Sequence, residues 1–226
     1  MNPLNRLGEL LEDWKFLLRR DGVRNAAPVI GIELIRLPYR RLRFVILARD
    51  LSDPLPVFQP KIPLEIRPFE PTDLKFAQTI DRPSEARLCQ RRLERGQAGF
   101  VAITDGQIAG YAWGCIQMDP QLERVTFDLL PGDFLCTDVF TVPAWRGRGN
   151  QTALTLARLE HFKALGYQRA ICYIEQHNAP SLAVWQRKLE STTLGWIDFT
   201  RAGSHYQVRY QWSNGYATGK IAGITE

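Results

Sequence analysis

A glycine-rich turn in the middle of this chain joins an apolar, β-branched stretch to an amphipathic helix. The stretch is Asp138-Val-Phe-Thr-Val-Pro143, the turn is Arg146-Gly-Arg-Gly149, and the helix is expected to begin near Gln151. Glycines let the backbone come close to a ligand, and the unpaired N–H groups of a first helical turn point toward it. The two arginines add positive charge. The sequence therefore predicts a site for a phosphate-bearing ligand at this turn.

Two widespread phosphate-binding patterns fit the turn poorly. The dinucleotide fingerprint G-x-G-x-x-G/A fits Gly147 and Gly149, but Thr152 stands where the third Gly or Ala belongs. The P-loop string G-x-x-x-x-G-K-[ST] does not occur. A third pattern, [QR]-x-x-G-x-[GA], matches Arg146-Gly-Arg-Gly149 in its first four positions and has Gln151 at its last.

With this third pattern and other segments in the same order, the chain resembles the GNAT superfamily of N-acetyltransferases. The stretch Phe100–Ile116, with its Asp-Gly turn, is similar to the second and third strands of that family. Asn178-Ala-Pro-Ser181 and Val184-Trp185 resemble the family segment N-x-x-[SA]-x-x-[LV]-[YF]. The resemblance covers roughly residues 64–212.

The resemblance implies an α/β (α+β) fold in which helices flank a mixed, mostly antiparallel sheet. Apolar residues at three- and four-residue spacing predict an amphipathic helix over residues 3–20. Two β-rich runs, Val29–Leu37 and Leu42–Arg49, predict a β-hairpin, and a further strand is expected at Val125–Leu130. We therefore divide the chain into an N-terminal helix plus β-hairpin at 1–62, an acetyltransferase-like domain at 63–212 and a C-terminal tail at 213–226.

The resemblance also implies that acetyl-CoA is the co-substrate. Its pantetheine arm would lie between two splayed strands, Phe134–Val142 and Arg169–Glu175, where a backbone N–H near Thr141 or Val142 would polarise the thioester carbonyl. N–H groups of residues 147–152 would hold the pyrophosphate. The residues that the resemblance assigns to this ligand are Phe140, Thr141, Val142, Arg146, Gly147, Arg148, Gly149, Asn150, Gln151, Thr152, Asn178, Ser181 and Trp185.

An acceptor amine must be neutral before it can attack the thioester. Because a lysine-like amine has a pKa of ~10.4, a carboxylate or an ordered water is usually recruited as the base. The candidates are Asp138, on the cofactor strand, and Glu175, at the end of the next strand. Trp185 stands where the family often has a tyrosine that protonates the leaving thiolate, and an indole N–H is not a useful acid. Tyr173, Tyr111 or water could take that role.

Composition and residue spacing also indicate where the protein is located and which metals or partners it is expected to lack. The cysteines lie far apart, which favours reduced thiols and a cytoplasmic location. No apolar run approaches the ~20 residues of a membrane helix. The histidines and cysteines lack metal-ligand spacing, so we expect no metal. Residues 1–62 hold eleven Lys and Arg against seven Asp and Glu but no dense basic run, so nucleic acid is not an expected partner.

These observations predict an N-acetyltransferase that moves an acetyl group to a primary amine by direct attack in a ternary complex. The acceptor would be a small molecule or a protein amine, and the sequence leaves a homodimer open. The departures at Gln151 and Trp185 support an alternative, a non-catalytic acyl-CoA-binding or protein-interaction module.

Overall fold

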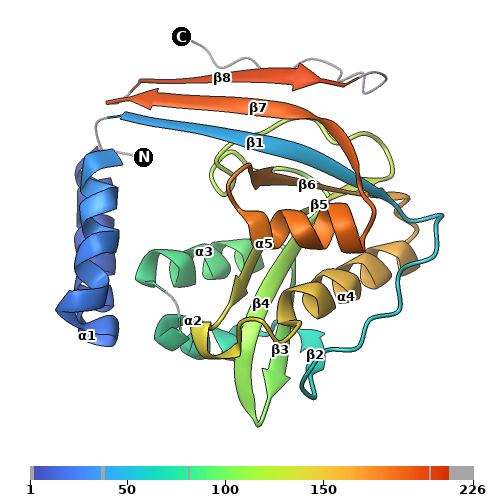
Figure 1. Cartoon of the computed structure of the whole chain (residues 1–226), viewed down its shortest axis with the longest axis horizontal. Coiled ribbons are helices and arrows are strands. Elements are labelled where there is room, and N and C mark those ends of the chain that lie inside the picture. Colours follow the sequence, from blue (N-terminus) through green and yellow to red (C-terminus); the bar gives the residue numbers. More distant parts are fainter. Residues whose placement is uncertain (1–2, 37–38, 81, 204, 214–226) are drawn as a thin grey trace.

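The computed structural model describes residues 3–36, 39–80, 82–203 and 205–213. The strands form one eight-stranded sheet in the order β2-β3-β4-β5-β6-β1-β7-β8 (Figure 1). Within it only β5 and β6 pair in parallel, so the predicted mixed, mostly antiparallel sheet is confirmed. The strands are β1 (Tyr39–Asp50), β2 (Glu65–Pro68), β3 (Ala98–Thr104), β4 (Gln107–Cys115), β5 (Asp133–Thr141), β6 (Arg169–Glu175), β7 (Thr192–Ala202) and β8 (His205–Trp212).

Helices cover both faces of the sheet because successive strand residues bury apolar side chains on opposite sides. On one face, here called the α4 face, α4 packs through Leu159 and Phe162 against Phe134 of β5. On the opposite α3 face, α2 and α3 pack against Tyr111 and Trp113 of β4. These helices are α2 (Leu74–Ile80), α3 (Pro83–Glu94), α4 (Asn150–Ala164) and α5 (Ala179–Leu182), which continues as a π-helical turn at Ala183–Lys188.

The N-terminal helix α1 (Pro3–Arg36) is divided into two segments at Gly22, whose φ of 72° and ψ of 164° are not helical. Trp14 Nε1 donates to Glu33 Oε2 at 2.7 Å, although a straight helix would separate these residues by roughly 28 Å. The two segments therefore fold back on each other. Arg82, at the start of α3, forms an ion pair of 2.6 Å with Glu33 and ties α1 to the α3 face (Figure 1).

The predicted hairpin at Val29–Leu37 and Leu42–Arg49 is wrong. The described part of the first run lies in the second segment of α1, and the second run belongs to β1. A short apolar run has no clear period, so its sequence suits a strand as well as a helix. The helix predicted at residues 3–20 is confirmed.

The strand predicted at Val125–Leu130 is also wrong. This stretch belongs to an irregular connection between β4 and β5. Val125 and Phe127 nevertheless bury their side chains in the core, and Thr126 O accepts a 2.7 Å hydrogen bond from Tyr210. Apolar residues of this stretch are therefore buried without strand pairing.

β1 lies between β6 and β7 and pairs with both. Ile46 and Leu47, near its centre, are fully buried on opposite faces of the sheet. The division at residue 62 stays a prediction, but β1, from the segment before it, belongs to the same sheet as the strands after it. The proposed tail, apart from residue 213, lies outside the described residues.

We predict that a fragment of residues 63–226 does not fold by itself. It would expose the unpaired edges of β6 and β7, which invite aggregation, and would lose the apolar side chains of β1 from both cores. Circular dichroism during thermal unfolding should show no cooperative transition for the soluble fraction of this fragment. A soluble monomer that unfolds cooperatively would contradict the role given to β1.

Candidate active site

β5 and β6 are joined at only one end. Of the nine residues of β5, only Asp133–Leu135 pair with β6, opposite Arg169–Ile171. A two-point ion pair closes this end, with Arg169 Nε and Nη2 at 2.8 and 3.0 Å from the Asp133 oxygens. Beyond Leu135 the register ends, so the facing backbone edges of the two strands have no partner strand. The predicted splay of these strands is confirmed.

A β-bulge explains why β5 turns away from β6. Asp138 and Val139 together face the single residue Ala112 of β4, and Asp138 has a φ of 38°. A bulge bends its strand and increases the local twist. Gly110 is required beside it, because a Cβ there would lie 2.4 Å from the carbonyl oxygen of Phe140.

A cleft of about 600 Å³ opens where the end of β5 meets the N-terminus of α4. The structure gathers residues there that lie up to 49 positions apart in the chain, from Val139 to Lys188. Val139, Trp145, Pro180, Val184 and Lys188 also line it and were not predicted. The predicted residues in its lining are Phe140, Thr141, Arg146, Gly147, Gly149, Asn150, Gln151, Thr152, Asn178 and Ser181.

The mouth of the cleft suits an anion. Gly147 and Gly149 have φ values of 73° and 100°, and α4 begins directly after them, so its first N–H groups face this turn. Lys188 Nζ donates to Thr152 Oγ1 at 2.9 Å, and Arg146 Nε donates to Thr141 O at 3.2 Å. The donors and positive charges needed for a diphosphate are therefore present together.

Side-chain contacts hold the two walls of the cleft in place. Gln151 Nε2 donates to Ser181 Oγ at 2.8 Å, which ties α4 to α5. Asn178 Oδ1 accepts a hydrogen bond from the N–H of Ser181 at 3.3 Å, so Asn178 caps the N-terminus of α5. Gln151, where the family pattern has a small residue, thus spans the cleft wall.

Three predicted cofactor residues do not line the cleft. The N–H of Val142 donates to Ala109 O at 2.9 Å, so it is not available to a thioester oxygen. Because neighbouring peptide groups of a strand point to opposite sides, the N–H of Thr141 faces away from β4 and is the remaining candidate. Trp185 is buried in the core of the α4 face, and the Arg148 guanidinium lies 5.0 Å above the ring of Trp145.

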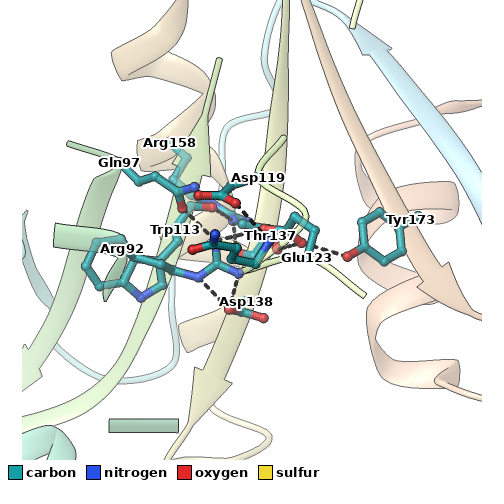
Figure 2. Close-up of polar contacts among 10 residues, drawn as sticks. Arg92, Gln97, Trp113, Asp119, Glu123, Thr137, Asp138, Arg158 and Tyr173 are labelled. Atoms are coloured by element: carbon teal, nitrogen blue, oxygen red, sulfur yellow. Dashed lines mark hydrogen bonds and ion pairs between the residues drawn. The ribbon is translucent and has the colours of Figure 1, made fainter. Parts of the chain in front are cut away.

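On the α3 face, a buried arginine gathers two carboxylates (Figure 2). Arg92, whose side chain is 1% exposed, donates to Asp138 Oδ2 at 2.7 Å and to Glu123 Oε1 at 2.8 Å. Burial alone would lower the pKa of Arg92, but Asp138 and Glu123 raise it above its usual value. This guanidinium therefore stays charged and fixes the Asp138 carboxylate.

Glu123 is shared with two further donors. Thr137 Oγ1 and Tyr173 Oη donate to Glu123 Oε2 at 3.1 and 2.7 Å. Burial, together with the charge of Glu123 and the hydrogen bond to it, raises the pKa of Tyr173 well above its usual value. Tyr173 is therefore a neutral phenol whose proton already has a partner. Glu123 and Arg92 were missed because no motif links residues from a helix, a loop and two strands.

Asp138 also faces a second, smaller cavity of about 240 Å³. Its wall includes the stacked rings of Tyr111 and Phe140, 5.3 Å apart, and Glu85 of α3. Phe140 borders the 600 Å³ cleft as well, so the end of β5 separates the two cavities. Glu175 lines neither of them, and its backbone pairs with Phe44 of β1.

The sequence also made predictions about metal binding, membrane helices, cysteines, location and oligomeric state. Over the residues that the structure describes, no group of His, Cys, Asp and Glu could hold a metal ion. In the same residues, every helix falls short of the length and apolar character needed to cross a membrane. All four cysteines are buried, as expected. The cytoplasmic location and the homodimer stay predictions.

Residues 64–190 match the sequence model of the acetyltransferase (GNAT) family. The chain belongs to this family. A mycothiol acetyltransferase of Streptomyces griseus is 26% identical over 181 residues, covering 73% of this chain and 53% of that protein. A mycothiol acetyltransferase of Frankia casuarinae is 27% identical over 204 residues, covering 82% of this chain and 56% of that protein. This GNAT chain thus spans about half the length of the curated relatives it matches.

Solved structures of the GNAT family share the fold. A GCN5-related N-acetyltransferase from Sphaerobacter thermophilus gives a TM-score of 0.51 at 19% identity, over 79% of this chain and 56% of that one. A putative GNAT acetyltransferase from Novosphingobium aromaticivorans gives a TM-score of 0.50 at 17% identity, over 72% of this chain and 66% of that one. At these identities the likeness concerns the fold alone.

Replacing Arg92 should strongly destabilise this GNAT fold. Arg92→Leu leaves the Asp138 and Glu123 carboxylates without their buried counter-charge, which should lower the free energy of unfolding by about 3–5 kcal/mol. The control is Arg95→Leu on the same stretch of chain, where a 52% exposed side chain pairs with Asp119 and about 0–1 kcal/mol is expected. Urea unfolding measures both, and equal losses would contradict the account.

Proposed function

We propose that the chain is an acetyltransferase that moves the acetyl group of acetyl-CoA to a primary amine. One observation carries this proposal: the splayed ends of β5 and β6 lead into a cleft whose mouth is a glycine turn at the N-terminus of α4. Backbone N–H groups at such a turn suit a pyrophosphate, and an unpaired strand edge suits the amides of pantetheine. Membership of the GNAT family supports the same co-substrate.

The two sides of β5 differ in charge, which fits one anionic and one cationic substrate. The cofactor side presents Arg146 and Lys188. The small cavity on the α3 face presents the carboxylates of Asp138 and Glu85; Arg82 also lines it, and its guanidinium is paired with Glu33. A protonated amine would be drawn to the carboxylates, and the stacked aromatic wall would pack against its apolar part. Its volume of about 240 Å³ suits a small amine or the end of a larger one.

In this proposal Asp138 is the base. Its side chain is 34% exposed, and Arg92 holds one of its oxygens. The carboxylate borders the small cavity on the α3 face, here called the acceptor cavity because the amine would bind there. It takes a proton from the ammonium, directly or through water, and the neutral nitrogen then attacks the thioester carbon. The N–H of Thr141 stabilises the oxyanion, the C–S bond breaks, and an amide and the CoA thiol result.

The acid that protonates the departing thiolate is not Trp185, which is buried in the core. Tyr173 donates its proton to Glu123, so Tyr111, in the wall of the acceptor cavity, or a water is left for this step. The alternative function, a non-catalytic acyl-CoA-binding module, rests on this missing tyrosine. A non-catalytic module would bind acyl-CoA in the same cleft as an enzyme but would not transfer the acyl group.

Turnover with a panel of primary amines tests the proposal. We expect release of the CoA thiol with at least one amine and, for Asp138→Asn, a fall of kcat by about 10²–10⁴-fold because the base is lost. Asp105→Asn is a matched control, since Asp105 is also at positive φ, 49°, but lies in the β3–β4 turn.

The outcomes of this experiment distinguish the acetyltransferase from the non-catalytic module. Binding of acetyl-CoA without CoA release for any amine would favour the non-catalytic module. CoA release that is unchanged in Asp138→Asn would show that Asp138 is not the base, and Glu175 would be the next residue to test.

A further inference from the structure

The segment between β1 and β2 runs past α4 to the glycine turn (Figure 1). The N–H of Lys61 donates to Arg148 O at 2.9 Å. A Cβ on Gly149 would lie 2.9 Å from Phe58 Cζ and 3.2 Å from Pro60 Cα. This segment therefore braces the turn from outside the region 64–190 that the GNAT family model covers.

Phe58 also holds a cation of the cleft. Lys188 Nζ lies 4.8 Å from the centre of the Phe58 ring and 2.9 Å from Thr152 Oγ1. The ring face attracts the ammonium, and the Thr152 hydroxyl oxygen accepts a hydrogen bond from it. The side chain of Lys188, an exposed residue, is thereby kept at the mouth of the cleft.

We propose that Lys188 binds the phosphate groups of acetyl-CoA and that Phe58 is the residue that positions both Lys188 and the glycine turn for them. The inference rests on the proposed function. A lysine held in its binding position loses less side-chain freedom when a phosphate arrives, so the ring increases affinity without touching the ligand. Phe58 thus makes the N-terminal segment part of the cofactor site.

The test compares donors with and without phosphate. We would measure the dissociation constant of acetyl-CoA by calorimetry, and KM and kcat for acetyl-CoA and for S-acetylpantetheine, which lacks the phosphates. Phe58→Ala and Lys188→Met should each weaken acetyl-CoA binding by about tenfold, as expected for one charged contact. KM for S-acetylpantetheine and kcat should change less than about twofold, because neither residue contacts the pantetheine or the reacting atoms.

Two further variants sharpen the result. Val57→Ala is the matched control, since Val57 is the neighbour of Phe58 and is fully exposed. The double variant Phe58→Ala, Lys188→Met should bind acetyl-CoA about as weakly as Phe58→Ala alone, because the contribution of Lys188 is already lost in that variant. Affinity should also depend less on salt in Lys188→Met than in the unmodified protein. Lys188→Met alters an exposed side chain, so it reports on the phosphates even if Phe58→Ala folds poorly.

Equal losses for both donors would overturn the inference, since they would reflect a general structural defect. Unchanged acetyl-CoA binding in Lys188→Met would overturn it too, while leaving the proposed function intact. An unmodified protein that binds no acetyl-CoA would overturn the proposed function and this inference with it.

Discussion

The β-bulge at Asp138 is the feature on which both sides of the candidate site depend. Because Asp138 and Val139 share one position of β4, the end of β5 bends away from β6 and the cleft opens. The same bulge turns the Asp138 carboxylate to Arg92, which also holds Glu123. A buried guanidinium without these carboxylates would be strongly unfavourable, so the ion network keeps the bulge in place.

The N-terminal part of the chain is built into this arrangement. β1 fills the sheet between β6 and β7, and Glu33 of α1 pairs with Arg82, which borders the acceptor cavity. The following segment reaches the other side of the molecule and packs Phe58 against Gly149. One continuous segment therefore contacts the surroundings of both proposed substrates. This explains in physical terms why the family match alone underestimates the folded unit.

Local patterns account for what the sequence predicted well. The glycine turn and the Asn178 cap are encoded by neighbouring residues, and the cleft lining near them was found from those motifs. Arg92 and Lys188 reach the site through contacts between residues 36 or more positions apart, which no single-sequence motif encodes. The run Val29–Leu37 was misread because a short apolar stretch suits a strand or a helix, and its apolar side chains Val29, Ile32 and Leu34 are exposed, so no burial pattern distinguishes the two.

In the proposed complex, acetyl-CoA lies along the open edge of β5 with its pyrophosphate at the glycine turn. Hydrogen exchange measured with and without acetyl-CoA tests this placement, because it reports on backbone amides one by one. Slower exchange is expected at Thr141 and at residues 147–152 when the ligand is present. A third cavity, of about 710 Å³, is lined by residues that include Arg95 and His161. Protection confined to that cavity, or no protection anywhere, would contradict this placement.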